Sequence, residues 1–388
     1  MPASSVRLGM IGGGAGAFIG KVHRQAAALA GGIELVAGAF SRDPASNAET
    51  GRECGLPAQR VYASWQALLE GEAGLDPNER INLLAIVTPN HLHAPIAAAA
   101  LQAGIHVFCE KPAALTSADT RSLAQLLDNA DVLYGLAHTY QGYPMIWQAR
   151  HMVQAGEIGR VRKLHVEYPQ GWLSDDLAGQ GNRQAAWRGD PQLAGQGGCI
   201  GDIGTHAFSL AEFVSGQRIA RICAHLATHV PGRALDDDCA MLLLTEQGAS
   251  GVLLASQVCA GEENALKIRL YGDKGGLEWR QEEPNSLIHR SLDQPMRVLR
   301  AGANHSWLCD DALRRIRLPA GHPEGYLEAM ANLYGDFARA IAGSRSAAAA
   351  LPGIETGARG MAFIEAALAS HASEAKWTVL APTAGVQP

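Results

Sequence analysis

The sequence predicts a two-domain α/β protein, with a parallel sheet in the first domain and a large, mostly antiparallel sheet in the second. At 388 residues the chain is too long for one compact core of ordinary size. Before residue 140, short β-rich runs alternate with helical stretches, which is typical of a parallel sheet wrapped by crossover helices. Later β-like runs follow one another without helix-length gaps, as antiparallel strands do. We therefore expect domains at residues 1–140 and 141–388, and the last helix could pack back on the first domain.

Apolar runs and helix signals define the elements of the first domain. Strands are expected at residues 6–12, 33–40, 81–88, 105–110 and 132–138. A helix after the third strand has Pro95 near its start and Gly104 just past its end, the usual asymmetry of helix ends. The next helix opens with Thr116 and Asp119 at the spacing of a capping box.

The second domain is expected to combine an antiparallel sheet, covered on one face, with a few helices. Pro144 and Gly156 bracket its first helix, and residues 163–168 then alternate in polarity like a strand. Residues 171–200 and 281–320 have weak periodicity, so we expect long functional or mobile loops there. The remaining expected elements are strands at 219–228, 238–245, 250–259 and 266–271, helices near 323–343 and 353–371, and a return of "WTVL" to a sheet edge.

The overall composition is that of a soluble α/β protein whose partner is a small molecule. Hydrophobic residues make up 47% of the chain and charged residues 18%, which does not suggest disorder. The net charge is −6, and no basic cluster is present. Nucleic acids and anionic membranes both need a concentrated positive face, so we expect neither as a partner.

Cysteine usage and the first residues predict a cellular location. The seven cysteines form no CxxC pair and have no disulfide-like spacing. The N-terminus enters an apolar strand almost directly, without the features of a signal peptide, and no segment approaches the apolar length of a membrane span. We therefore expect a reduced, cytoplasmic protein.

A glycine-rich loop follows the first predicted strand and leads into a helix. Glycines let the backbone approach a pyrophosphate, which the amides and dipole of the helix N-terminus then hold. The spacing is imperfect, because a GxGxxG match needs a glycine where Ala17 stands. A flexible loop without a ligand is the alternative, but the position after the first strand of a βαβ unit favours a dinucleotide. The candidate cofactor-binding residues here are Gly12, Gly14, Gly16, Phe18 and Ile19.

The end of the second strand bears on the choice between NAD and NADP. An Asp or Glu at this point would bind the ribose hydroxyls of NAD. Ser41 and Arg42 stand there instead and suit a 2′-phosphate, although Arg42 also suits stacking on the adenine of NAD, and Asp43 follows. We predict NAD or NADP as the cofactor, with a preference for NADP.

Polar residues follow the third strand, at the carboxyl edge of the sheet where ligands of doubly wound folds bind. They are Thr88, Pro89 and Asn90. His91 and His93 could suggest a metal pair, but no third ligand is evident nearby. We predict no metal site, and we place the three strand-end residues and His93 near the cofactor.

Glu110, Lys111 and Pro112 close the fourth strand. An isolated Glu-Lys pair at a strand end is usually a solvated ion pair. At this edge of the sheet, however, an ammonium group could reach both the nicotinamide and a substrate oxygen. Pro112 also restricts the residue before it to an extended conformation. We predict cofactor contacts for Glu110, and both cofactor contacts and a catalytic role for Lys111.

A second constellation lies in the glycine-rich segment "GGCIGDIGTH", where Asp202 and His206 are four residues apart. On a helix this spacing places both side chains on one face. A carboxylate beside an imidazole is what general acid–base catalysis needs. A capping aspartate with a hydrogen-bonded core histidine is the structural alternative, and a zinc site that includes Cys199 is another, although no metal motif supports it.

The "EKP" motif, followed later in the chain by "GDIGTH", resembles the glucose-fructose oxidoreductase/inositol dehydrogenase/rhizopine catabolism (Gfo/Idh/MocA) family of NAD(P)-dependent oxidoreductases. The similarity covers nearly the whole chain. It implies a Rossmann dinucleotide-binding domain followed by a C-terminal α/β domain, whose open sheet forms the interface of a homodimer or homotetramer. It also implies that Lys111, Asp202 and His206 are the catalytic residues. The insertion in the glycine loop departs from the family pattern and leaves the phosphate contacts open.

The resemblance suggests reversible oxidation of a secondary alcohol on a sugar, polyol or cyclitol. In this hypothesis His206 takes the hydroxyl proton, Lys111 donates a hydrogen bond to the developing alkoxide, and Asp202 orients the substrate or the histidine. Aromatic faces with polar edges suit carbohydrate surfaces, and Gln170 lies among such residues. The candidate substrate-binding residues are Tyr168, Trp172, Trp187, Arg188 and His322.

Three other functions are compatible with the same residues. The first is a glycoside-cleaving enzyme that retains and recycles its NAD(P). The second is a non-catalytic NAD(P)-sensing protein, and the third is a structural oligomer that binds no cofactor. The complete set of Lys111, Asp202 and His206 favours an oxidoreductase that acts on CH–OH groups.

Overall fold

The computed structural model describes residues 6–128 and 130–382, and these form two compact units. The first unit runs to Thr139 and also includes Met330–Ala358. The second contains Tyr140–Ala329 and residues 359–382. The domain boundaries drawn from the sequence stay predictions.

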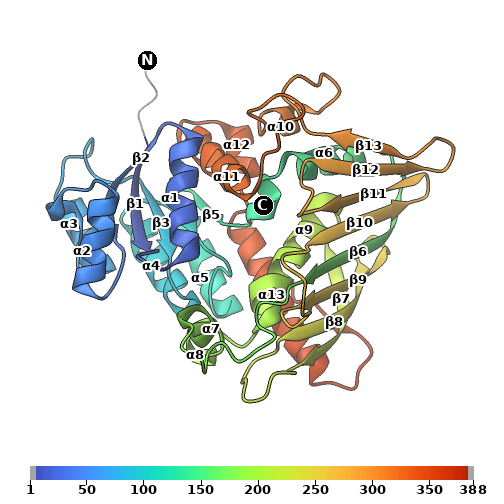
Figure 1. Cartoon of the computed structure of the whole chain (residues 1–388), viewed down its shortest axis with the longest axis horizontal. Helices are drawn as coiled ribbons and strands as arrows, with labels where there is room; N and C mark the ends of the chain where they lie inside the picture. Colours follow the sequence, from blue (N-terminus) through green and yellow to red (C-terminus); the bar gives the residue numbers. More distant parts are fainter. Residues whose placement is uncertain (1–5, 129, 383–388) are drawn as a thin grey trace. The chain divides into compact units, whose positions relative to one another are not determined.

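The first unit is built on a five-stranded parallel sheet, as predicted (Figure 1). Its strands lie in the order β2–β1–β3–β4–β5. The strand order reverses between β1 and β3, and ligands of doubly wound sheets bind beyond the carboxyl ends of the strands at such a point. The strands are β1 (Val6–Gly12), β2 (Ile33–Ala39), β3 (Leu83–Val87), β4 (His106–Cys109) and β5 (Tyr134–Leu136).

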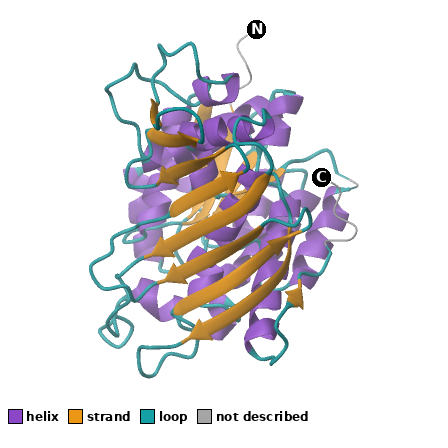
Figure 2. Cartoon of the chain, turned by 90° about the vertical axis from the view of Figure 1, so that its right-hand side faces the viewer, coloured by secondary structure: helices purple, strands orange, loops and turns teal. Residues whose placement is uncertain are grey.

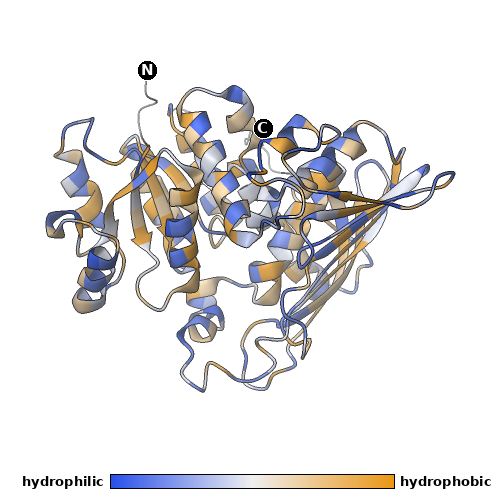
Figure 3. Cartoon of the chain, turned by 45° about the horizontal axis from the view of Figure 1, so that its top comes forward, coloured by the Kyte–Doolittle hydropathy of each residue, from blue (hydrophilic) through white to orange (hydrophobic). Residues whose placement is uncertain are grey.

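Helices connect these strands and cover the sheet. The core beside β3 and β4 is formed by fully buried strand residues and by the apolar face of α4, which includes Ile96 and Ala100. Figure 3 shows the strands of this unit mainly in apolar colours. The helices of the unit are α1 (Phe18–Ala30), α2 (Pro44–Glu53), α3 (Trp65–Ala73), α4 (His93–Gln102), α5 (Ser117–Leu127) and α12 (Arg345–Ala350), with 3₁₀ turns at Ala58–Arg60 and Asn90–Leu92.

The predicted capping box at the start of α5 is present. The Thr116 hydroxyl accepts from the Asp119 backbone N–H at 3.2 Å, and the Asp119 carboxylate accepts from the Thr116 N–H at 3.1 Å. Both contacts satisfy backbone donors that a helix leaves unpaired at its first turn.

The second unit is built on a nine-stranded sheet in the order β13–β12–β11–β10–β6–β9–β8–β7–β14. All neighbouring strands are antiparallel except β6 and β9, which run parallel. This confirms the mostly antiparallel sheet. The short β14 pairs with β7, so the "WTVL" segment does return to a sheet edge. The strands are β6 (Val161–Pro169), β7 (Ile219–Ala227), β8 (Asp238–Thr245), β9 (Ser250–Ser256), β10 (Lys267–Gly272), β11 (Gly275–Arg280), β12 (Ser286–Ser291), β13 (Arg297–Arg300) and β14 (Thr378–Val379).

Helices pack on one face of this sheet. α9 packs on β6, β9 and β10, and α6 packs on α9 and on β11 and β12. Figure 2 views the strands from the opposite face. The helices are α6 (Pro144–Gln154), α7 (Arg183–Arg188), α8 (Pro191–Ala194), α9 (Thr205–Ser215) and α10 (Asp310–Leu313), with the 3₁₀ turn η3 (Thr139–Gly142) and a π-helical turn, η4 (Ile200–Gly204). Two long helices, α11 (Tyr326–Ile341) and α13 (Ile354–His371), each contribute residues to both units.

The segment 281–320 differs from its predicted loop character, because it contains β12, β13 and α10. β12 has six residues, and β13 has four, two of which are arginines. Runs this short and this charged do not produce a readable alternation of polarity. β11 was also missed, because its glycines, charged residues and single tryptophan interrupt the apolar pattern.

Candidate active site

The glycine loop after β1 has the geometry of a close backbone approach. Gly12 has φ +80°, and a Cβ atom at this position would lie 2.3 Å from the Val87 carbonyl oxygen. No residue with a side chain fits there without moving β3. The loop therefore passes directly over the carboxyl ends of β1 and β3.

Gly20 fulfils the packing role of the glycine that the fingerprint lacks at position 17. It lies in the first turn of α1, and a Cβ atom on it would be 2.3 Å from both the Cα and the carbonyl oxygen of Gly13. The third glycine of a dinucleotide fingerprint serves this close packing. The loop is thus longer than the usual pattern, but it still brings the helix against the strand end.

The start of α1 suits a phosphate group. Its N-cap residue, Ala17, makes no side-chain cap hydrogen bond, so no side chain occupies the N-cap position. Arg24 donates to the Gly13 carbonyl oxygen at 2.6 Å, and the Thr50 hydroxyl accepts from the Ala15 N–H at 3.1 Å, which fixes both sides of the loop. Phe18 is 72% exposed at the mouth of the loop. This arrangement fits the pyrophosphate of a dinucleotide.

Asp43, the acidic residue that follows β2, is already engaged in a helix cap. The Asp43 carboxylate accepts from the Ser46 N–H at 2.8 Å and caps α2. The Ser41 hydroxyl accepts from the Asp43 N–H at 3.1 Å. Arg42 is exposed.

His93 ties two strand-end loops together. Its Nδ1 lies 2.7 Å from the Pro112 carbonyl oxygen, and its Nε2 lies 2.9 Å from the Thr88 carbonyl oxygen. Burial lowers the pKa of this histidine, although the two hydrogen bonds act in the opposite direction. Both ring nitrogens are engaged with backbone, so His93 does not form a metal pair with His91. Asn90, at the start of the following 3₁₀ turn, is buried.

Glu110 is held by a residue that the sequence analysis did not select. His23 of α1 approaches it with Nε2 2.9 Å from Glu110 Oε1, and His23 Nδ1 lies 2.7 Å from the hydroxyl of Tyr334 on α11. Burial acts to raise the pKa of the Glu110 carboxyl, but the His23 hydrogen bond and the charges of His23 and Lys111 outweigh it and hold that pKa below its usual value. Glu110 is therefore ionised near neutral pH.

Lys111 follows Glu110 at the carboxyl end of β4, and its peptide bond to Pro112 is cis. Its backbone N–H donates to Glu110 Oε2 at 3.2 Å. His138, which follows β5, is buried in the same unit. Burial, reinforced by the positive charge of Lys111, lowers the pKa of His138 to about 3, so this imidazole is neutral.

In the second unit, Asp202 lies in the π-helical turn η4 that leads into α9. Its Oδ2 atom accepts from Arg188 Nε at 3.2 Å and from Gln257 Nε2 at 2.9 Å. π turns inside helices are rare and occur mostly at functional positions. The structure thus brings together Asp202 and Arg188, two residues that the sequence analysis proposed for separate roles.

Asp236 anchors the glycine-rich entry to this turn. Its carboxylate accepts from the N–H groups of Gly198, at 2.6 Å, and Ile200, at 2.8 Å. A Cβ atom on Gly198 would lie 2.2 Å from the Asp236 carbonyl oxygen, so a glycine is required. Burial raises the pKa of Asp236 despite these hydrogen bonds.

His206, in the first turn of α9, is buried against two tyrosines. Its ring centroid lies 4.9 Å from that of Tyr140 and 6.5 Å from that of Tyr168, both edge-on. Tyr168 is only 2% exposed. Its hydroxyl contacts the hydroxyl of Tyr140 and donates to Asn264 Oδ1 at 2.7 Å. Burial raises the pKa of Tyr168 well above its usual value, so its phenol is neutral.

The other predicted substrate-binding residues have different surroundings. Trp172 donates to Gln170 Oε1 at 3.1 Å, and the Arg188 guanidinium lies 4.3 Å from the ring of Trp187 and 6.0 Å from that of Trp172. Trp172 and Trp187 therefore lie near Arg188, the residue that binds Asp202. His322 is exposed and lies in a loop, with Nδ1 3.2 Å from the Pro319 carbonyl oxygen.

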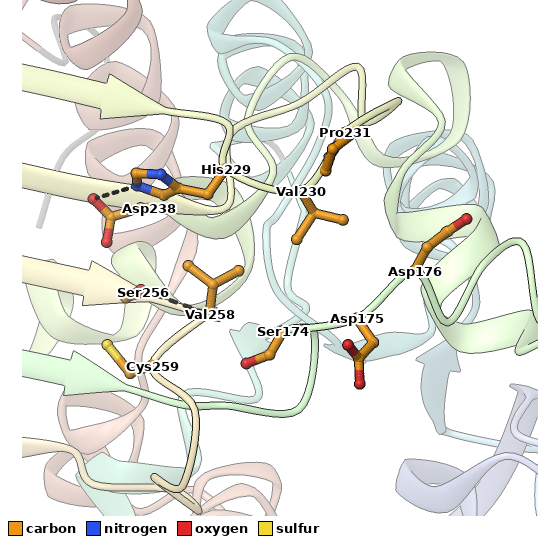
Figure 4. Close-up of a pocket in the computed structure, with 10 residues that line it drawn as sticks. All are labelled: Ser174, Asp175, Asp176, His229, Val230, Pro231, Asp238, Ser256, Val258 and Cys259. Carbon is orange, nitrogen blue, oxygen red and sulfur yellow. Dashed lines mark hydrogen bonds and ion pairs between the residues drawn. The ribbon is translucent and has the colours of Figure 1, made fainter.

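A pocket of about 750 Å³ lies at the ends of β8 and β9 (Figure 4). Ser256 and Val258 line it on either side of Gln257, the residue that binds Asp202. Its other lining residues are Ser174, Asp175, Asp176, His229, Val230, Pro231, Asp238 and Cys259. The pocket is acidic and open, and it lies beside the strand end that supports Asp202.

Among residues 6–128 and 130–382, no three His, Cys, Asp or Glu side chains are arranged to hold a metal ion. Within the same residues, no helix is long and apolar enough to cross a membrane.

Comparison with known proteins decides the family. The model described as "Oxidoreductase family, NAD-binding Rossmann fold" matches residues 6–138, and the model of the "GFO/IDH/MocA C-terminal domain" matches residues 146–278. The chain belongs to the Gfo/Idh/MocA oxidoreductase family. It is 32% identical, over 96% of both chains, to the uncharacterised oxidoreductase YfiI of Bacillus subtilis. The first unit is thus a Rossmann NAD-binding fold, and the enzyme is an NAD-dependent oxidoreductase.

Two further proteins are similar to this chain. Levoglucosan dehydrogenase of Pseudarthrobacter phenanthrenivorans is 27% identical over 73% of this chain and 75% of its own length. An inositol dehydrogenase homolog from Azotobacter vinelandii, solved with NAD+, has a TM-score of 0.92 at 37% identity and covers 97% of this chain and 98% of its own. An inositol dehydrogenase homolog from Azotobacter vinelandii has also been solved with NADH and myo-inositol.

Several residues of the site have roles that depend on distant contacts and were not predicted from the sequence. His23, Tyr334 and Gln257 each bind a predicted site residue or its partner from elsewhere in the chain. For His23 the sequence did contain a local signal. The helix after the glycine loop must pack one face on the sheet, and a histidine in its second turn places a polar group on that face.

Proposed function

We propose that the protein oxidises a secondary alcohol of a sugar, polyol or cyclitol to the ketone with NAD(P), and catalyses the reverse reduction. The observation that carries this proposal is the position of Lys111, directly after the fourth strand of an NAD-binding parallel sheet. Relatives described as levoglucosan dehydrogenase and inositol 2-dehydrogenase support the substrate class. So does the complex of the homolog with myo-inositol.

The proposed roles divide the chemistry among three side chains. His206 accepts the proton of the substrate hydroxyl as a general base. Lys111 donates a hydrogen bond to the oxygen on which negative charge develops. Such a donor stabilises the transition state most strongly where water is excluded. Asp202, held by Arg188 and Gln257, orients the substrate or the imidazole. When bound, NAD(P) supplies the hydride acceptor at its nicotinamide ring.

The remaining site residues are proposed as binding groups. The glycine loop with Phe18 and Ile19 holds the pyrophosphate side of the cofactor, and Thr88, Pro89, Asn90, His93 and Glu110 lie along the strand ends toward the nicotinamide. Trp172, Trp187 and Arg188 cluster beside Asp202 and offer apolar faces with polar edges, which suit a sugar ring. Tyr168 contributes through its hydroxyl network, and the exposed His322 is a further proposed contact.

Substitution of the proposed catalytic residues tests the assignment. His206→Ala and Lys111→Ala should each lower kcat by about 10²- to 10⁴-fold on the true substrate, because a general base or a positioned donor is lost. Wild-type enzyme is first assayed with NAD+ and NADP+ against a panel of polyols and sugars, by the absorbance of the reduced nicotinamide. Near-full turnover in both variants would contradict the proposal, and an unchanged thermal midpoint would show that each variant is folded.

The cofactor preference is a separate proposal. We infer a preference for NADP, because Asp43 is committed to capping α2 while Ser41 and Arg42 stand at the end of β2. Arg42→Ala should then raise KM for NADP+ more than KM for NAD+. The inference is wrong if kcat/KM for NAD+ exceeds that for NADP+ in the wild-type enzyme.

We also propose a homodimer or homotetramer that forms through the open face of the nine-stranded sheet. Leu242 of β8 and Leu254 of β9 are 45% and 43% exposed on neighbouring strands. Exposed apolar clusters on a sheet face are typical of an interface. Sedimentation of wild type and of Leu242→Lys/Leu254→Lys checks this, and a monomeric wild type at micromolar concentration would contradict it.

All seven cysteines are free, which supports a reduced, cytoplasmic location.

A further inference from the structure

Both oxygens of the Glu110 carboxylate are engaged by groups of the first unit. Oε1 accepts from His23 Nε2 at 2.9 Å, and Oε2 accepts from the backbone N–H of Lys111 at 3.2 Å. The second contact fixes the chain at the residue proposed to act on the substrate. The first contact brings in α1, the helix that also packs against the glycine loop through Gly20.

The orientation of His23 is fixed by its surroundings. A carboxylate can only accept, so His23 Nε2 carries a proton whether the ring is neutral or charged. On the other side of the ring, Nδ1 lies 2.7 Å from the Tyr334 hydroxyl. His23 is fully buried, and its ring packs 5.6 Å from Phe108 and 5.7 Å from Tyr334, centroid to centroid. The ring therefore cannot turn away from Glu110 without breaking both hydrogen bonds and the packing.

This chain of hydrogen bonds orients groups and does not conduct protons to water. Tyr334 is fully buried, and its ring packs edge-on against Phe108 at 4.7 Å, so the chain ends inside the protein. Burial also keeps the phenol of Tyr334 protonated by raising its pKa. In metal sites, residues that hydrogen-bond a ligand on the side away from the metal fix its orientation, and His23 stands in the same relation to Glu110.

We propose that His23, held by Tyr334, is a positioning residue of the reaction: it keeps Glu110 ionised and fixed, and Glu110 in turn fixes Lys111. The inference rests on the proposed function, in which Lys111 donates to the reacting oxygen. The proposed role of His23 also explains why Glu110 precedes Lys111. A carboxylate fixed by His23 supplies both a rigid contact to the Lys111 backbone and a constant negative charge beside its ammonium group.

The charges around Glu110 determine the expected pH dependence. Its neighbours are His23 on α1, Lys111 beside it, His93 on α4, Tyr334 on α11 and the neutral His138 after β5. Without the His23 donor, burial dominates and the carboxyl binds a proton at higher pH. The ionised form is the working form, so activity is then lost on the acid side at a higher pH than in wild type.

A matched pair of amides tests the proposal. In His23→Gln the side-chain nitrogen reaches the Nε2 position and still donates to Glu110, whereas in His23→Asn it reaches only the Nδ1 position. His23→Asn should lower kcat by about 10- to 100-fold, the loss typical when a residue that orients a metal ligand is removed and taken here by analogy. KM should change little, and the acid limb of the kcat profile should move to higher pH. His23→Gln should keep most of the wild-type kcat and the wild-type acid limb. A role in packing alone would affect both variants alike.

Glu110→Gln supplies the control for the route of the effect. The double variant His23→Asn/Glu110→Gln should be no slower than Glu110→Gln alone, because His23 acts only through Glu110. Thermal midpoints confirm that each variant is folded. Equal kcat and equal acid limbs for the Asn and Gln variants, or additive losses in the double variant, would overturn the proposal. If His23→Asn does not fold, a Glu110→Gln enzyme that keeps the wild-type acid limb overturns it in the same way.

The proposed function fails by a different result. If Lys111→Ala retains turnover, the proposed role of Lys111 is wrong, and His23 then has no catalytic group to position. If Lys111→Ala is inactive while the two His23 variants behave alike, only the positioning role is wrong.

Discussion

Replacing Gly20 by alanine should weaken the binding of NAD and of NADH. A Cβ atom at this position would lie 2.3 Å from the Gly13 Cα and from its carbonyl oxygen. Carbon atoms pack at about 3.5 Å or more, so α1 and the loop must separate by roughly 1 Å. Overpacking of this kind costs about 1–3 kcal/mol. If the distortion falls on the cofactor loop, Kd for NADH rises by about 5- to 150-fold.

Two other glycine variants separate the causes of such a loss. Gly16 and Gly31 both have positive φ, at +80° and +75°, and a Cβ atom on either would meet nothing within 4 Å. Alanine at each should cost about 1–3 kcal/mol of backbone strain. Only Gly16 lies in the loop, so Gly16→Ala should weaken NADH binding and Gly31→Ala should only lower the thermal midpoint. Fluorescence titration with NADH measures all three. A folded Gly20→Ala protein with the wild-type Kd would refute the close-approach argument.

Three further predictions follow from the described contacts. Thr116→Ala should lower the free energy of unfolding by about 1 kcal/mol in urea, through loss of the capping box, and leave kcat unchanged; a change in kcat would contradict it. Gln257→Ala should lower kcat, because Asp202 loses the amide that holds it at 2.9 Å, and Gln257→Glu should lower it further by placing a second carboxylate there; steady-state assays that rank the two the other way would contradict the assignment. His138→Asn should flatten the acid side of the stability profile. The pKa of His138 is about 3 in the folded protein against an ordinary 6.5, so the unfolded chain binds the proton first and stability is lost as pH falls from 6.5 toward 3. The whole effect amounts to roughly 4–5 kcal/mol at ~1.36 kcal/mol per pKa unit, and an unchanged pH dependence of the unfolding free energy in the variant would contradict it.

Local signals in the sequence predicted local structure well. The capping box of α5 depends on two residues three positions apart, and both of its hydrogen bonds are present. The five parallel strands follow from apolar runs separated by helix-length gaps, and "WTVL" does pair with β7. In each case the physical cause lies within one short segment.

Contacts between residues that are far apart in the sequence could not be predicted from local patterns. His23 and Glu110 are 87 positions apart, and His23 and Tyr334 are 311 apart. Asp236 anchors Gly198 from 38 positions away. The parallel pairing of β6 with β9 is also invisible in the sequence, because alternation of polarity defines a strand but not its neighbour or direction. β11, β12 and β13 were missed because they are short and carry many charged residues.

Transfer of deuterium tests the central claim most directly. A polyol or sugar substrate found in the NAD(P)+ panel is labelled with deuterium at the carbon that bears the reacting hydroxyl, and the product cofactor is examined by proton NMR. Our account predicts that deuterium appears at C4 of the reduced nicotinamide with wild-type enzyme, and that the rate of this transfer falls by about 10²-fold or more in Lys111→Ala and His206→Ala. Deuterium that is absent from the cofactor, or that is transferred at the wild-type rate by both variants, would contradict it.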